Sequence, residues 1–176
     1  MQVVGQQVSS WLPQTQQTLS DYLNGKKGMA LLFWSGICSH CQRYDRYLNS
    51  FEQRHPEIAL LTVACRQEEP IKEIMDCRLK RNLNFQMVHD INRELAHRWF
   101  VNQTPRVFLL DRDLKLLYRG AIDNFLYPQD PGYDPYLEKA VAEFLNREPI
   151  SVVETQSFGC AIESAYYSLS SPTNRS

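Results

Sequence analysis

Cys38 and Cys41 lie two residues apart in the stretch LLFWSGICSHC, which runs from Leu31 to Cys41. Because a thiolate can bind metal or attack a sulfur atom, this spacing fits half a zinc site, a disulfide crosslink or a redox pair. Zinc needs four ligands, and no second closely spaced pair of cysteines or histidines occurs in the chain. A disulfide that closes so short a loop would constrain the unfolded chain very little. The pattern therefore favours a redox-active pair, with no metal and no other cofactor.

The segments on either side of this pair predict how the two thiols differ. Residues 29–34 form a continuous apolar run typical of a buried strand, and residues 39–54 have the apolar periodicity of a helix. Free N–H groups and the helix dipole at the start of a helix stabilise a thiolate, so we expect a lowered pKa for Cys38. Cys38 is then the nucleophile and Cys41 the resolving thiol.

Strand and helix patterns alternate along the rest of the chain. We expect further buried strands at 57–65 and 85–90, a β-hairpin from 106–111 and 114–120, and helices at 15–23, 68–81, 91–100 (with Asp90 as N-cap) and 135–146. This order predicts an α/β fold with a mixed central sheet flanked by helices. The domain is expected to span residues 28–147, preceded by an N-terminal extension (1–27) with a short helix and followed by a partly disordered tail (148–176).

Composition limits the partners and the compartment. The chain has 176 residues and a formal net charge of −1, which gives no electrostatic case for binding nucleic acid. No apolar run is long enough to span a membrane, so we expect no membrane span, and we expect a monomer. The N-terminus lacks the basic and apolar parts of a signal segment, which favours the cytoplasm; an extracytoplasmic location stays open if Met1 is an introduced start.

The segment FWSGICSHC resembles the Phe-Trp-x-x-x-Cys-x-x-Cys motif of the thioredoxin superfamily, and Thr104-Pro105 before RVFLLD resembles its cis-proline loop. The resemblance implies that Pro105 is cis and lies beside the redox pair, with the Thr104 backbone pairing with a substrate chain. It also implies a substrate groove whose apolar surface comes from Trp34 and Ile37.

The interval between Cys38 and Pro105 holds one more helix and strand than a minimal thioredoxin, which resembles the TlpA-like and redoxin-like branch, as does RVFLLDRDLKLLYRGAID. This resemblance implies a thiol–disulfide oxidoreductase that acts on protein thiols or disulfides and exchanges electrons with an upstream redox partner.

Two further functions remain open. One is a peroxiredoxin-like peroxidase, although Ser35 stands where the threonine of the peroxiredoxin motif would be and the matching proline is absent. The other is a non-catalytic interaction module that uses the two cysteines only as a local crosslink.

Several residues around the pair have more than one interpretation. Ser39 and His40, between the cysteines, could tune the redox pair, with a cationic His40 stabilising the Cys38 thiolate, or His40 could be an exposed helix-start residue. Glu68 or Glu69 could accept a proton from Cys41, or both could be first-turn residues of the following helix.

The three remaining cysteines have different surroundings in the sequence. Cys65 and Cys77 fall in apolar patterns and are expected in the core. Cys160 lies in SFGCAIE, which resembles a Gly-Cys-x-Ile ending of some redoxin-like proteins. It could pair with another thiol or with a partner chain, or stay free on a docked C-terminal strand; the free thiol is the favoured interpretation.

Overall fold

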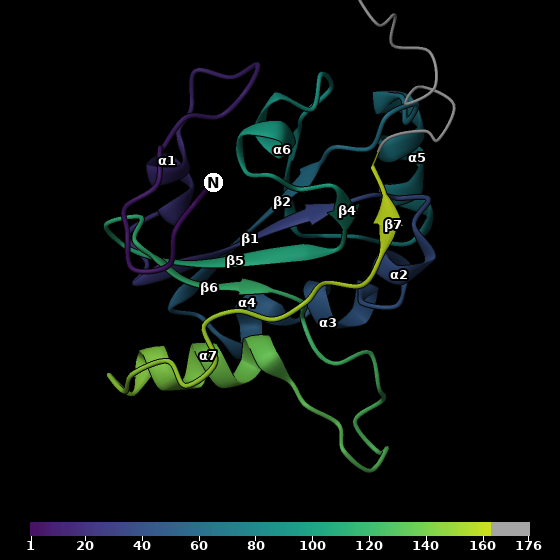
Figure 1. Cartoon of the computed structure of the whole chain (residues 1–176). Helices are drawn as coiled ribbons and strands as arrows, with labels where there is room; N and C mark the ends of the chain where they lie inside the picture. Colours follow the sequence, from purple (N-terminus) through teal and green to yellow (C-terminus); the bar gives the residue numbers. More distant parts are fainter. Residues whose placement is uncertain (163–176) are drawn as a thin grey trace, which may run out of the picture.

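The structure, a computed structural model, describes residues 1–162 and has alternating strands and helices through most of that range (Figure 1). The strands are β1 (Gly28–Trp34), β2 (Ile58–Ala64), β3 (Gln86–His89), β4 (Gln103–Thr104), β5 (Arg106–Asp111), β6 (Leu116–Gly120) and β7 (Cys160–Ala161). The helices are α1 (Leu19–Leu23), α2 (Ser39–Gln42), α3 (Asp45–Asn49), α4 (Phe51–Arg54), α5 (Ile71–Lys80), α6 (Glu94–Arg98) and α7 (Tyr136–Leu145).

Five strands form the central sheet, in the order β3-β2-β1-β5-β6. The first three strands are parallel, and β5 and β6 run antiparallel to their neighbours, so the sheet is mixed as predicted. β5 and β6 form the expected hairpin. β4 and β7 form a separate two-stranded antiparallel sheet beside the end of β1 (Figure 1). This mixed sheet flanked by helices confirms the predicted thioredoxin-like fold class, including the extra helix and strand before Pro105.

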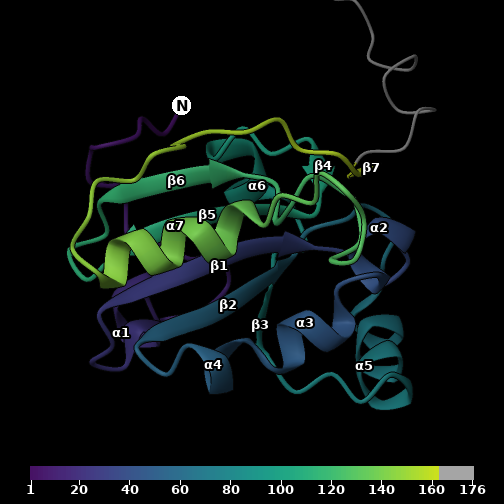
Figure 2. The same ribbon diagram turned by 90° about the horizontal axis from the view of Figure 1, so that it is seen from below.

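Side chains of β1 alternate between two apolar cores, one on each face of the sheet. Ala30, Leu32 and Trp34 pack with α2, α3, α4, α5 and α7 on one face. Met29, Leu31 and Phe33 pack with α1 and α6 on the other. Figure 2 shows α7 lying across the first of these faces. Because β1 is buried on both faces, its sequence is a continuous apolar run.

The expectation of a single helix over 39–54 is wrong, because the chain forms three short helices there. One break lies at Ser50 (φ −95°, ψ −3°), which is both the C-cap of α3 and the N-cap of α4. The Ser50 hydroxyl donates to the carbonyl oxygens of Arg46 and Tyr47, and such side-chain bonds compete with the helical backbone pattern.

Three other helices begin later than the patterns predict. α1 begins at Leu19 rather than at residue 15, because Thr18 is its N-cap. α5 begins at Ile71 because Pro70 is its N-cap and Glu68 has a left-handed backbone (φ +63°). The N-cap of α6 is Arg93 rather than Asp90. The Asp90 carboxylate still accepts hydrogen bonds from the backbone N–H groups of Leu95 and Ala96, so it caps the helix from outside the N-cap position.

Both terminal segments pack against the sheet. Leu12 and Leu19 are buried in the core that contains α1 and α6. Gln7 forms an antiparallel β-bridge with Lys115. From α7 the chain returns along the β6 edge to β7, where it lies beside β4 and near α2 (Figures 1 and 2). The part of the tail expected to be disordered, 163–176, lies outside the described residues. Among residues 1–162, no helix has the length and apolar character needed to cross a membrane.

Candidate active site

The two cysteines of the motif lie where β1 ends and α2 begins. Cys38 is the N-cap residue of α2, its side chain is buried, and it lies 3.8 Å from Cys41. The carbonyl oxygen of Cys38 accepts hydrogen bonds from the N–H groups of Cys41 and Gln42. These bonds form the helical turn that carries Cys41. The rigid, fully buried β1 therefore holds both sulfur atoms at one point.

Cys41 lies in an apolar environment with few charges. Burial raises the pKa of the Cys41 thiol to about 12, and the negative charge of Glu69 adds to this effect. The Thr104 side chain and the Arg81 guanidinium act in the opposite direction and lower the pKa of Cys41. Cys41 is therefore a protonated thiol at neutral pH, protected from solvent.

Thr104 and Pro105 flank the cysteines on the other side. The peptide bond between them is cis, as the resemblance predicted. The Thr104 carbonyl oxygen lies 3.4 Å from Cys38 Sγ. The Thr104 hydroxyl is buried without a hydrogen-bond partner among residues 1–162, close to Cys41. β4 thus borders both sulfur atoms.

Cys160 is the third sulfur at this place, and it forms a disulfide with Cys38. The expectation that Cys160 is a free thiol is therefore wrong. It does lie on a docked C-terminal strand, because Cys160 pairs with Thr104 and Ala161 with Gln103 in the antiparallel pairing of β7 with β4. The remaining cysteines within the described range, Cys41, Cys65 and Cys77, are free.

The segment leading to Cys160 is attached to the domain at several points. The N–H of Thr155 donates to the Arg119 carbonyl oxygen, and the Thr155 hydroxyl lies 2.7 Å from the Tyr118 hydroxyl. The Gln103 side chain donates to the Ser157 carbonyl oxygen. Beyond Cys160, Ile162 is buried and its N–H donates to Asn102. Contacts on both sides of Cys160 thus hold it against Cys38.

Glu69 contacts the loop that carries Cys38 and Cys41, and Glu68 does not make the same contacts. The Glu69 carboxylate accepts hydrogen bonds from the Ser35 hydroxyl (2.8 Å) and the Gly36 N–H (2.6 Å). Both glutamates precede α5, so the interpretation of them as first-turn helix residues is wrong. Glu68 is exposed, with a left-handed backbone conformation.

Arg81 fixes the same loop from the end of α5. Its guanidinium donates to the Gly36 carbonyl oxygen (2.7 Å) and to both carboxylate oxygens of Asp45 on α3. It also lies 3.0 Å from Cys77 Sγ. Cys77 is half-buried beside Gly36, whereas Cys65 is fully buried as expected.

Trp34 and Ile37 have opposite exposures. The Trp34 ring is completely buried and packs edge-on against Phe85, so the expectation that it supplies apolar surface is wrong. Ile37 is 56% exposed directly before Cys38 and does supply such surface. Ser39, the first residue of α2, is also exposed.

His40 lies between Cys160 and the loop after β6. Its Nδ1 lies 3.6 Å from Cys160 Sγ, and its ring stacks on Phe125 with a centroid separation of 4.9 Å. The Arg43 guanidinium lies over the rings of Phe125 and Tyr127 and donates to the Leu126 carbonyl oxygen. His40 is therefore placed to act on the sulfur of Cys160.

One group of residues within the described range could hold a metal ion. The ligand atoms of Cys38, His40 and Cys160 lie within 4.8 Å of one another. The disulfide uses both sulfur atoms, so this state offers no thiolate pair to a metal.

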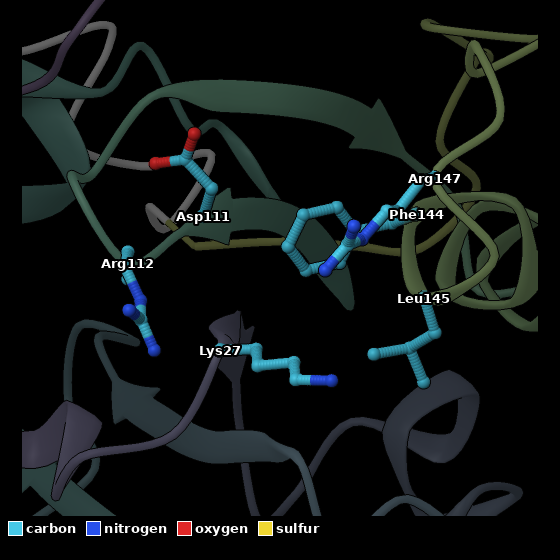
Figure 3. Close-up of a pocket in the computed structure, with 6 residues that line it drawn as sticks. All are labelled: Lys27, Asp111, Arg112, Phe144, Leu145 and Arg147. Carbon is cyan, nitrogen blue, oxygen red and sulfur yellow. The ribbon is translucent and has the colours of Figure 1, made fainter.

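A separate pocket of about 310 Å³ lies at the opposite end of β1 (Figure 3). Figure 3 shows the basic side chains of Lys27, Arg112 and Arg147 around it, together with Asp111, Phe144 and Leu145. Because Gly28 and Asp111 pair at that end of the sheet, the pocket is remote from Cys38. The pocket is therefore separate from the site around Cys38.

Sequence reasoning gave pairing of Cys160 with another thiol as one alternative, from the Gly-Cys-x-Ile resemblance, but favoured the free thiol. It missed the roles of Arg81 and Phe125. No local pattern distinguishes Arg81 or Phe125 from other surface residues.

Solved structures share this fold over most of the chain. An uncharacterised conserved protein from Geobacillus kaustophilus is 18% identical, with a TM-score of 0.76 over 93% of each chain. A hypothetical protein from Sinorhizobium meliloti is 22% identical, with a TM-score of 0.72 over 84% of this chain and 85% of that one. A Chlorobium tepidum protein described as thiol:disulfide interchange protein DsbE is 18% identical, with a TM-score of 0.55 over 66% of this chain and 85% of that one.

Sequence comparisons agree with this fold. A thioredoxin-like protein from Haemophilus influenzae is 26% identical over 90 residues, which are 51% of this chain, and the chain spans about half the length of that relative (52%). The model of the AhpC/TSA family matches residues 5–119, a range that contains Cys38, Cys41, Thr104 and Pro105. The chain therefore belongs to the AhpC/TSA family.

Proposed function

We propose that this protein is a thiol–disulfide oxidoreductase that exchanges a Cys38–Cys41 disulfide or dithiol with protein substrates. The observation that carries the proposal is the placement of Cys38 at the start of α2, 3.8 Å from Cys41 and bordered by Thr104. Two thiols this close can form and release a mixed disulfide in succession. We infer that an upstream dithiol or disulfide protein restores the pair after each turnover.

The two thiols have distinct roles in this mechanism. Cys38 lies at the end of the motif nearest exposed Ile37 and already bonds another sulfur, so it forms the mixed disulfide with the substrate. Cys41 is buried below it and then attacks Cys38 Sγ, which releases the substrate thiolate. Glu69 and the Thr104 hydroxyl are polar groups that influence Cys41, and Glu69 is the proposed proton acceptor.

The test is reduction of insulin disulfides, with wild-type protein compared with Cys38→Ser and Cys41→Ser. We expect turnover by the wild type, none by Cys38→Ser, and a mixed disulfide with insulin in Cys41→Ser that becomes stable when Cys160→Ser is added, because a free Cys160 can displace the substrate from Cys38. Equal, background rates in all three proteins would leave the non-catalytic module as the function.

Peroxide consumption measured on the same proteins separates the peroxidase alternative. The hydroxyl of Ser35 donates to Glu69, so it is engaged away from a peroxide bound at Cys38. We therefore expect slow peroxide consumption relative to insulin reduction. A peroxidase rate that exceeds the disulfide-exchange rate would contradict the proposal.

A further inference from the structure

We propose that the segment around Cys160 is an internal substrate: it occupies the edge of β4 and forms with Cys38 the mixed disulfide that an external substrate would form. This inference rests on the proposed function and names the competitor for its site. It makes Cys160 a third redox-active cysteine of the protein.

Burial of the redox pair is the first argument. Cys38 and Cys41 both have no exposed surface when the Cys160 segment is docked. A protein thiol must reach Cys38 Sγ in order to exchange with it. Because Cys38 is fully buried while Cys160 is bonded to it, an external chain can reach this sulfur atom only after the Cys160 segment has been displaced.

The manner of docking is the second argument. β7 adds to β4 as an antiparallel strand, with Cys160 opposite Thr104. Strand addition of this kind is a general way for a domain to bind an extended peptide. The contact is very close: a Cβ atom on Gly159 would lie 1.8 Å from the Thr104 carbonyl oxygen. Glycine before the cysteine is therefore required for this docking.

The anchors of the segment are the third argument. Thr155 bonds to the β6 edge through Arg119, and buried Ile162 bonds to Asn102 on the far side of Cys160. A thiol tethered in this way has an effective concentration on the order of millimolar toward its partner. It therefore competes well with any protein substrate at lower concentration.

The exchange that opens the site conserves electrons. Cys41 gives its proton to Glu69, the proposed acceptor, and its thiolate attacks Cys38 Sγ. The Cys38–Cys41 bond forms, the Cys38–Cys160 bond breaks, and Cys160 leaves as a thiolate that takes up a proton. His40 Nδ1, 3.6 Å from Cys160 Sγ, is placed to deliver that proton. No external oxidant or reductant is needed, because one disulfide replaces another.

The docked segment also defines the class of external substrate. An incoming chain that replaces it must be extended, must present a cysteine opposite Thr104, and must have a small residue directly before that cysteine. Substrates with a bulky residue at that position are expected to react more slowly.

The experiment combines disulfide mapping with alkylation, and both are independent of catalysis. Wild-type protein is equilibrated in glutathione buffers of several ratios, quenched with acid and digested without reduction, and the crosslinked peptides are identified by mass spectrometry. The fully reduced protein is then treated with N-ethylmaleimide, and the rate at which Cys38 is modified is measured. Both are repeated on Gly159→Ala, in which the added methyl group prevents docking, and on Phe158→Ala, the matched control at the exposed neighbouring residue.

We expect peptides containing Cys38–Cys160 and Cys38–Cys41 in the wild type and in Phe158→Ala. In Gly159→Ala we expect Cys38–Cys41 to replace Cys38–Cys160, because the tethered competitor is removed. We also expect Cys38 to be alkylated on the order of tenfold faster, because the segment that covers it no longer docks. Absence of the Cys38–Cys160 peptide from the wild type at every ratio overturns the proposal. So does a Gly159→Ala protein that behaves like the wild type in both measurements.

Insulin reduction by the same three proteins keeps this inference separate from the proposed function. Faster reduction of insulin by Gly159→Ala than by the wild type supports both the proposed function and the inference about the Cys160 segment. If mapping and alkylation respond as expected but none of the proteins reduces insulin, the proposed function fails, whereas the covering of Cys38 by the Cys160 segment stands.

Discussion

At the scale of single residues, the surroundings make the two cysteines of the motif unequal. Cys41 has no exposed surface, and burial raises the pKa of its thiol to about 12. Cys38 borders the exposed side of the motif and bonds Cys160. The same chemical group is therefore a buried thiol at one position and a partner in a disulfide at the other.

The raised pKa of Cys41 predicts a steep pH dependence. Because only the thiolate reacts, a rise in the pKa from 9.0 to about 12 makes the reactive fraction at neutral pH about a thousandfold smaller. Alkylation of Cys41 by iodoacetamide in the reduced, folded protein should be slow at pH 7 and should accelerate about tenfold per pH unit, up to the pKa. Mass spectrometry of the modified peptides measures the alkylation rate, and the urea-unfolded protein is the control. Equal alkylation rates of Cys41 in the folded and the unfolded protein would contradict the prediction.

His40 is expected to influence the redox potential of the pair. A cationic imidazole near Cys38 and Cys160 favours thiolates, which exist only in the reduced protein. His40→Phe keeps a ring to stack on Phe125 and removes both imidazole nitrogens. In a Cys160→Ser background we expect the Cys38–Cys41 potential to fall by on the order of 30 mV, a tenfold change in the equilibrium constant. Titration in glutathione buffers measures the two potentials. Equal midpoints for the Cys160→Ser protein with and without His40→Phe would exclude a role for His40.

At the scale of elements, three segments distant in sequence hold the redox loop. β1 delivers it, Glu69 before α5 accepts the N–H of Gly36, and Arg81 at the end of α5 donates to the carbonyl oxygen of Gly36. Arg81 also pairs with Asp45 on α3. The geometry of the motif therefore depends on the packing of α3 and α5 as well as on the local sequence.

Replacing Arg81 tests this dependence. Arg81→Gln removes a partly buried ion pair with Asp45 and a hydrogen bond to Gly36, which should lower the free energy of unfolding by about 2 kcal/mol. Arg46→Gln, a matched exposed arginine on α3, should change it by less than about 0.5 kcal/mol. Urea denaturation of both variants measures the difference. Equal stability of the two would mean that Arg81 does not hold the loop.

At the scale of the whole molecule, the sheet separates two cores. The core with α2, α3, α4, α5 and α7 contains Cys38 and Cys41, and the other contains Leu12, Leu19 and Leu23 from the N-terminal segment. Residues 1–27, expected from the sequence as an extension, contribute buried side chains to the second core. We infer that they fold as part of the same unit as residues 28–147.

This inference predicts the effect of Leu19→Ala. Leu19 is fully buried, so truncation should cost about 2–5 kcal/mol of the free energy of unfolding in a single cooperative transition. Leu79→Ala, at a position that is 80% exposed on α5, is the control and should cost under about 1 kcal/mol. Thermal denaturation followed by circular dichroism measures both. A separate early transition in Leu19→Ala would show that residues 1–27 form an independent extension.

Local patterns in the sequence determined the order of the main elements. The apolar run of β1, the hairpin of β5 and β6, and the periodicity of α7 reflect burial and backbone preference within single segments. Helix ends were less predictable, because the breaks depend on individual side chains such as Ser50. The spacing of Cys38 and Cys41 indicates a redox pair for the same reason, since it too is a property of one short segment.

Only the tertiary structure decided which groups surround that pair. Cys160 is 122 residues from Cys38 in sequence. Glu69 and Arg81, at the two ends of α5, both bond to Gly36. The exposure of Trp34 likewise depended on how the helices cover β1. No segment encodes these contacts by itself, because each is stabilised jointly by two packed segments. The local sequence therefore determined the chemistry of the site, whereas the path of the whole chain decided that a third cysteine covers it.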